Sequence, residues 1–137
     1  HLTTRRQRQM CIRDRLEREE TDLPTSVELL SSVRTHLKAS VLERLDGADK
    51  FLLRVAMNSL AIAERELQLT PMLEAEELSR LMSLVGEGEL PELRWKLVHS
   101  LRSGVFPDAP ALHQHLRLSA AGRLAVDQPT YSALTPG

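Results

Sequence analysis

Residues 51–69 form the stretch that decides the fold class, FLLRVAMNSLAIAERELQL. Apolar side chains, among them Leu52, Val55 and Leu60, cover nearly every side of its first three helical turns. A helix that is apolar most of the way round packs inside a helical protein, because no single neighbour can cover it. We therefore predict that this helix lies at the centre of the fold and that Leu60 belongs to the core.

One polar line interrupts this apolar helix. Arg54, Asn58 and Arg65 stand at i, i+4 and i+11, which places them along one line of an α-helix. Asp127, which closes the last expected helix just before a proline, could reach an arginine of this line. The four residues are either a polar network that fixes helix register or a ligand-binding site. We favour the network, because a buried amide such as that of Asn58 is tolerated only when its hydrogen bonds are made.

The composition indicates an ordinary globular protein made of helices. The chain has 137 residues, of which 42% are hydrophobic and only 3% aromatic, and a core rich in Leu, Ala and Val favours helices over a sheet. Its single cysteine, Cys11, excludes an internal disulfide. No apolar run approaches the roughly 18 residues of a membrane span. We expect a cytoplasmic protein with no membrane span and no nucleic-acid partner.

The first fifteen residues do not look like part of a folded protein. Residues 9–14 are Gln-Met-Cys-Ile-Arg-Asp, which resembles the translation of a transposon end used to prepare sequencing libraries. The segment holds five arginines and one acid. Its apolar residues do not recur at the spacing of a helix or of a strand. We therefore expect residues 1–15 to be a disordered, non-native segment. The alternative is a genuine basic arm that binds a polyanion.

Start and stop signals divide the rest of the chain into about five helices. Thr25 and Glu28 form a capping box before the first of them, and Thr70-Pro71 is expected to end one helix and start the next. Gly122, inside the last helix, is expected to let another helix approach closely. The expected helices cover residues 26–45, about 50–69, 71–85, from 91 to just before 104, and 110–127. Short connections predict an all-α antiparallel up-down bundle, with one domain over 16–131 and a flexible tail over 132–137.

No motif for catalysis or for a cofactor emerges from the sequence. The histidines outside the first segment are not spaced as metal ligands, so we predict no metal site and no cofactor. Acidic side chains gather on two neighbouring stretches, and we interpret them as a solvated charged surface rather than as catalytic carboxylates. These are Glu64, Glu66, Glu74, Glu76 and Glu77. Catalytic residues stay unidentified, and the balance favours a protein that is not an enzyme.

Three strings of the body resemble a bacterial family of uncharacterised helical proteins, the domain of unknown function 6285. They are Pro24-Thr25 followed by Glu28-Leu29-Leu30, the central residues 51–67, and the final residues 124–131, LAVDQPTY. The usual central form of the family is closer to RVAANALAI, so that Met57 and Ser59 here replace two alanines. Gln128 stands where the family more often has Asn.

The resemblance implies a small partner protein, encoded beside phosphotransferase-like kinases and acyl-CoA dehydrogenases. Genomic context does not determine an activity, so two hypotheses follow. The first is a non-catalytic helical accessory protein that binds one of these enzymes. The second is a small domain that binds or transforms a ligand at Arg54, Asn58, Arg65 and Asp127. A closed cluster would favour the first hypothesis, and an open pocket around it the second.

Overall fold

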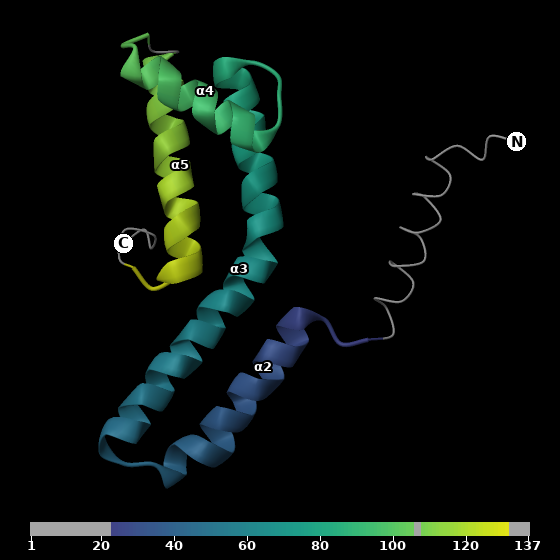
Figure 1. Ribbon diagram of the computed structural model, residues 1–137, viewed down its shortest axis with the longest axis vertical. Coiled ribbons are helices and arrows are strands. Elements are labelled where there is room, and N and C mark those ends of the chain that lie inside the picture. The colour runs from purple at the N-terminus through teal and green to yellow at the C-terminus, as the bar shows by residue number, and fades with distance from the viewer. Residues whose placement is uncertain (1–22, 106–107, 132–137) are drawn as a thin grey trace, which may run out of the picture. The chain divides into compact units, whose positions relative to one another are not determined.

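A computed structural model describes residues 23–105 and 108–131 of the chain (Figure 1). All regular structure in these residues is helical, which confirms the all-α class. The elements are α2 (Ser26–His36), a π-helical turn (Leu37–Val41), a 3-10 turn (Leu42–Arg44), α3 (Gly47–Val85), α4 (Leu90–Arg102) and α5 (Ala109–Asp127). The described residues thus contain four α-helices, and the five-helix bundle is not confirmed.

The chain divides into two compact units, which we call the first unit (residues 1–64) and the second unit (residues 65–137). The division falls inside α3, between Glu64 and Arg65. The expected non-native segment, 1–15, and the expected tail, 132–137, lie outside the described residues. The single domain expected over 16–131 stays a prediction.

The first unit is a helical hairpin made of α2 and the N-terminal part of α3 (Figure 1). Its first helix begins with the expected capping box: the amide of Glu28 donates to Thr25 Oγ1 at 3.2 Å, and the amide of Thr25 donates to Glu28 Oε2 at 2.7 Å. These two bonds satisfy backbone donors that the first helical turn leaves open. The α-helix expected over 26–45 ends earlier, at His36. The chain then forms the π-helical turn and the 3-10 turn.

The break expected at Thr70-Pro71 is absent, because α3 continues through both residues as one 39-residue helix. Pro71 lacks the N–H that would bond to the carbonyl of Leu67, and its ring crowds the same carbonyl, at a cost of about 3 kcal/mol. One missing bond does not end a helix whose turns on both sides pack against other helices. The positive φ of Gly86, 101°, then ends α3 where the sequence predicted.

The core lies in the second unit. Leu81 of α3 and Leu93 of α4 are completely buried, and Leu97 of α4 and Leu112 of α5 pack with them. The prediction that residues 51–69 form the centre of the fold is therefore wrong. In the first unit this helix has one neighbouring helix, α2, and a single neighbour covers only one side of it. Leu60 is half-buried rather than a core residue.

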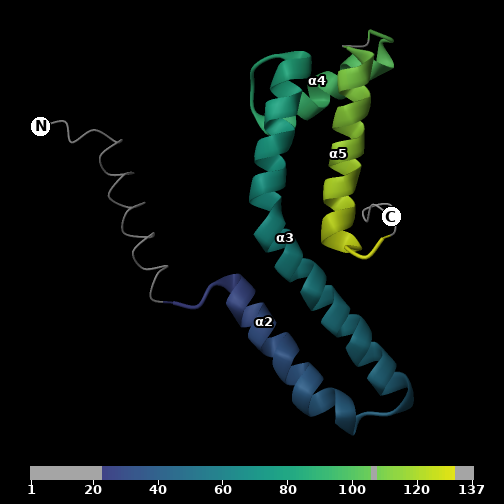
Figure 2. The same ribbon diagram turned by 180° about the vertical axis from the view of Figure 1, so that it is seen from behind.

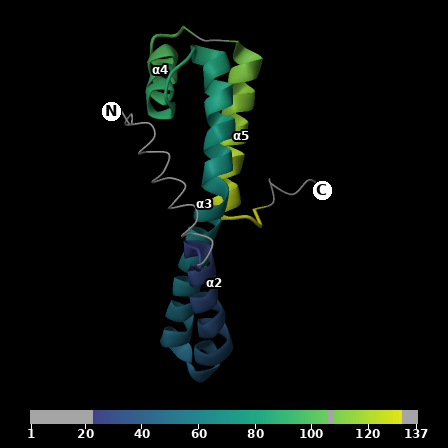
Figure 3. The ribbon, with the colours of Figure 1, turned by 90° about the vertical axis from the view of Figure 1, so that its right-hand side faces the viewer.

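Helices α3 and α5 lie side by side in the second unit, as Figures 1 to 3 agree. Gly122 of α5 permits this contact: a Cβ at its position would lie 3.0 Å from Cδ2 of Leu73. The prediction that Gly122 lets another helix approach closely is thus confirmed. α4 and α5 carry Pro91 and Pro110 in their first turns, where a missing N–H leaves no helical bond unmade.

Candidate functional site

The four residues predicted from the polar line are divided between the two units. Arg54 and Asn58 lie in the first unit, and both are exposed. The premise that the Asn58 amide is buried is therefore not met, because water can satisfy an exposed amide. Arg65 and Asp127 lie in the second unit. A common site of all four residues stays a prediction.

Arg65 contacts the end of α5. Its Nε donates a hydrogen bond to the backbone carbonyl of Val126, with an N···O distance of 2.6 Å. Carbonyls in the last turn of a helix have no partner within the helix, and a cation there also complements the helix dipole. Asp127, the next residue, is exposed, so that Arg65 holds the backbone of the helix end. This is a structural role for one of the four candidates.

Glu64 is not part of a solvated surface, contrary to our interpretation of the sequence. Only 8% of its side chain is exposed, and Oε2 lies 2.5 Å from Nε of Arg34 in α2. The bond to Glu64 raises the pKa of Arg34 above its usual range. This ion pair joins the two helices of the hairpin, and 30 positions separate its members. Helical periodicity within one segment could not have revealed it.

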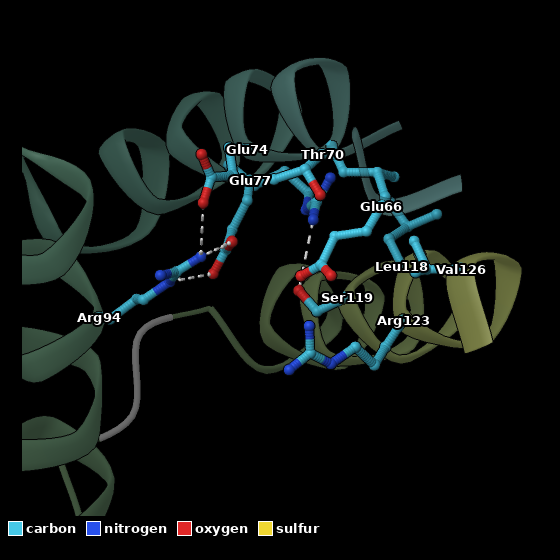
Figure 4. A pocket seen from close by; sticks show the side chains of 12 residues that line it. Glu66, Thr70, Glu74, Glu77, Arg94, Leu118, Ser119, Arg123 and Val126 are labelled. Carbon is cyan, nitrogen blue, oxygen red and sulfur yellow. Dashed lines mark hydrogen bonds and ion pairs between the residues drawn. The ribbon is translucent and has the colours of Figure 1, made fainter. Parts of the chain in front are cut away.

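A cavity of about 460 Å³ opens in the second unit, between α3 and α5 and beside Arg94 of α4 (Figure 4). Its volume lies within the range of about 300–1,000 Å³ that is usual for small-molecule sites. Charged side chains of both signs line it, together with apolar side chains along α3 and α5. The lining residues are Glu66, Thr70, Leu73, Glu74, Glu77, Arg80, Arg94, Leu118, Ser119, Gly122, Arg123 and Val126.

A forked ion pair between α4 and α3 forms part of the cavity lining. Nε and Nη2 of Arg94 donate to the two carboxylate oxygens of Glu77 at 2.9 and 2.6 Å, and Glu74 lies 3.9 Å from Nη2 (Figure 4). This hydrogen bonding lowers the pKa of Glu77 below its ordinary 4.5. Two parallel bonds fix the guanidinium in one plane. The charge of Arg94 is therefore already neutralised by the protein.

Arg80 on α3 is bound differently. Its Nε donates to Nδ1 of His115 and its Nη2 to Oγ of Ser119, both at 3.3 Å. His115 is only 4% exposed, and burial together with the nearby Arg80 charge lowers its pKa below 6.5. A neutral imidazole that accepts at Nδ1 carries its proton on Nε2. Arg80 is thus held in place by two neutral groups.

These five residues of the cavity and its wall, Glu77, Arg80, Arg94, His115 and Ser119, were missed as a group in the sequence. One signal was present: His115 and Ser119 stand four residues apart, so they share a face of α5. No local pattern links that face to Arg80, because 35 positions separate Arg80 from His115. Likewise, 17 positions separate Arg94 from Glu77.

Of the acids interpreted as solvated, Glu74 and Glu76 are exposed, whereas Glu77 is partly buried.

The first unit offers a surface of another kind. Two lines of uncharged residues, each spaced i, i+4, i+7 and i+11, follow α2 with its π-helical turn and α3. They are Leu29, Val33, His36 and Ser40 in one line, and Leu52, Ala56, Ser59 and Ala63 in the other. Each line stands one position before less exposed residues that face the other helix, such as Leu30 and Arg34 in α2 and Leu53 and Met57 in α3. Because the helices are right-handed and antiparallel, this shared offset places both lines on the same side of the hairpin, which we call the uncharged face. Its three large apolar side chains, Leu29, Val33 and Leu52, are 53%, 51% and 60% exposed.

The chain is a member of a helical family whose activity has not been assigned. Residues 43–131, more than half of the chain, match the family model of the domain of unknown function DUF6285, and the chain belongs to that family. No curated protein and no solved structure matches it.

Residues 23–105 and 108–131 contain neither a candidate metal cluster nor a candidate membrane span. No group of three or more His, Cys, Asp or Glu side chains gathers there in a way that could hold a metal ion. None of the helices there combines the length and the hydrophobicity that crossing a membrane requires.

Proposed function

We propose that this protein is a non-catalytic helical accessory protein that binds a partner enzyme through the uncharged face of its hairpin. The observation that carries this proposal is the exposure of Leu29, Val33 and Leu52 on one side of two adjacent helices. Large apolar side chains that gather on one surface characterise sites of protein association. The core of such an interface is depleted of charged residues, as this face is.

The chemistry of the face defines the partner surface that it suits. Eight positions in two helical lines carry no Asp, Glu, Lys or Arg, so an apolar, uncharged helical surface can pack on it without leaving an unpaired charge. Ala56, Ser59 and Ala63 are small, which permits a partner helix to lie close to α3. The opposite side of the hairpin carries Arg54 and Asn58 and remains in water.

The partner that we propose is the phosphotransferase-like kinase or the acyl-CoA dehydrogenase that the family resemblance implies. The resemblance supports these two enzymes, and the uncharged face supports a direct contact with one of them. The alternative function, a ligand site at Arg54, Asn58, Arg65 and Asp127, has less support, because Arg65 bonds to the end of α5.

The test is a titration of each purified enzyme with the purified chain, followed by calorimetry. Val33→Glu places a charge on the uncharged face, and we expect it to weaken binding at least tenfold. Thr35→Glu is the matched control: it adds the same charge to an exposed position on the other side of α2 and is expected to leave the affinity unchanged. Circular dichroism verifies that both variants keep their helices.

Three results would contradict the proposal. One is that neither enzyme binds, and another is that Val33→Glu and Thr35→Glu weaken binding equally. The third is a chain that forms a dimer by itself and loses that dimer in Val33→Glu, which would make a second copy the occupant of the face. Light scattering on the unmixed chain distinguishes this third result from the first two.

A further inference from the structure

The cavity of the second unit contains a feature that the accessory role does not use, the guanidinium of Arg80. Arg34 and Arg94 each have a carboxylate oxygen within 2.6 Å. Among the described residues, no carboxylate oxygen lies within 4 Å of a guanidinium nitrogen of Arg80, the distance that defines an ion pair. Its two acceptors, His115 and Ser119, are neutral. Arg80 is therefore a positioned cation without an ion-pair partner among the described residues, although Glu77 is near enough to attract it electrostatically.

The position of Arg80 makes this unpaired charge significant. The residue is partly buried, and its acceptor His115 is almost completely buried. A partly desolvated cation is more stable with an anion beside it than without one. A guanidinium has five N–H donors, and the two bonds to His115 and Ser119 leave the others available to the cavity that Arg80 lines. A planar fork of this kind matches a carboxylate.

The other lining residues restrict the class of anion. Three arginines, Arg80, Arg94 and Arg123, share the cavity with three glutamates, so the formal charge of the lining is balanced. A dianion such as a phosphate monoester would add a second negative charge beside those glutamates, where it gains little. One negative charge pairs with Arg80 and leaves the lining only slightly negative.

The remaining wall is apolar. Leu73 of α3 and Leu118 and Val126 of α5 line the same cavity, and Gly122 between them adds no side chain to fill it. The apolar part of a ligand, a chain of a few carbon atoms, can pack against this wall and so be removed from water. Arg123 stands four residues beyond Ser119 on α5, hence on the same helix face as the group that holds Arg80.

We infer that the cavity of the second unit binds a small organic acid, with Arg80 pairing to its single carboxylate and its apolar body lying against Leu73, Leu118 and Val126. This site is separate from the uncharged face, and it does not depend on the proposed partner. Arg94 and Glu77 also line the cavity, with their charges paired to each other. His115 and Ser119 are positioning residues, because they hold Arg80 and leave the carboxylate to it.

Hexanoate is the probe, and its binding to the full chain is measured by chemical-shift titration of backbone amides. Hexanamide and hexyl phosphate, with the same apolar body but no charge or two charges, are the comparison compounds. We expect hexanoate to shift amides of α3 and α5 around the cavity, with an affinity at least tenfold higher than that of either comparison compound. Equal binding of hexanamide would overturn the role of the charge, and tighter binding of hexyl phosphate would overturn the carboxylate assignment.

Variants test the role of Arg80 itself. Arg80→Gln is expected to weaken hexanoate binding at least tenfold, whereas Arg80→Lys, which retains the charge, is expected to recover part of it. Arg102→Gln removes an exposed arginine at the end of α4 and is the matched control, with no expected change. Ser119→Ala, which removes only one bond to Arg80, replaces Arg80→Gln if that variant does not fold. Unchanged hexanoate affinity in Arg80→Gln or in its replacement, or no shift with hexanoate in the original chain, would refute the inference.

Discussion

The second unit encloses Leu81 and Leu93 completely, whereas the large apolar side chains of the first unit stay half-buried or exposed. Of the described residues of the first unit, 23–64, only Glu64 is buried, and it is charged. Three helical segments surround the core of the second unit, and two form the hairpin of the first. Two helices can cover only one side of each other. The comparison shows that three helical segments can enclose a core, whereas two cannot, although both units also leave some large apolar side chains exposed.

The largest expected effect contrasts a core leucine with a leucine of the uncharged face. Leu93→Ala empties a completely buried position, and we expect it to lower the free energy of unfolding by about 2–5 kcal/mol. Leu52→Ala, with the same atoms removed from a side chain that is 60% exposed, should change it by less than about 0.5 kcal/mol. Urea unfolding followed by circular dichroism measures both. Similar losses in the two variants would mean that Leu52 is covered in solution.

The next effect concerns α3, the helix that contributes to both units. Pro71 is exposed and lies inside this helix, where it removes one backbone bond. We expect Pro71→Ala to raise the free energy of unfolding by about 1–3 kcal/mol, because alanine restores the N–H and favours the helix. Ala75→Gly, at an exposed position one turn later, is the opposite control and should lower the free energy by about 1 kcal/mol. A less stable Pro71→Ala variant would show that α3 requires the proline.

A third comparison sets two arginines of the first unit against each other. Arg34 pairs with the buried Glu64, and Arg34→Ala leaves that carboxylate without its ion pair to α2. We expect a loss of about 1–2 kcal/mol in the free energy of unfolding. Arg54→Ala removes an exposed arginine and should cost less than about 0.5 kcal/mol. Equal losses would mean that Arg54 has a role in the fold that its exposure does not indicate.

These comparisons also show what the sequence could predict. Local chemistry was sufficient for the all-α class, for the capping box of Thr25 and Glu28, and for the end of α3 at Gly86. It was also sufficient for the close approach at Gly122. Each of these features depends on residues near one another in the chain or on a single backbone position.

Features that depend on contacts between residues far apart in the chain could not be predicted from the sequence in the same way. The all-round apolar surface of residues 51–69 suggested a central helix, but the pattern does not count how many neighbours a helix has. The proline at 71 suggested a break, but packing on both sides kept the helix continuous. The cavity around Arg80 joins α3 to α5 across 35 and 39 positions, and no alternation within one helix predicts which residues meet at that distance.

The smallest expected effect is a pH dependence that arises from His115 in the second unit. Burial and Arg80 lower the pKa of His115 below 6.5, and the weaker attraction of Glu77 does not reverse this. The unfolded chain therefore binds a proton at a higher pH than the folded protein does. It follows that the contribution of neutral His115 to stability is complete above pH 6.5 and is lost as the pH falls through the folded pKa. Glu77, whose pKa is lowered from 4.5, acts in the same direction but only in more acidic solution.

We expect the free energy of unfolding to be lower at pH 5.5 than at pH 7.5, and His115→Gln to reduce this difference. The glutamine amide cannot be protonated in this range, so the variant lacks the histidine contribution at both pH values. His36→Gln is the matched control, because His36 is exposed on α2 in the first unit, and it should keep the difference found in the original chain. Urea unfolding at the two pH values measures all three proteins. A loss of the difference in His36→Gln, together with an unchanged difference in His115→Gln, would contradict this prediction. The pH-sensitive histidine would then be His36 of the hairpin and not His115.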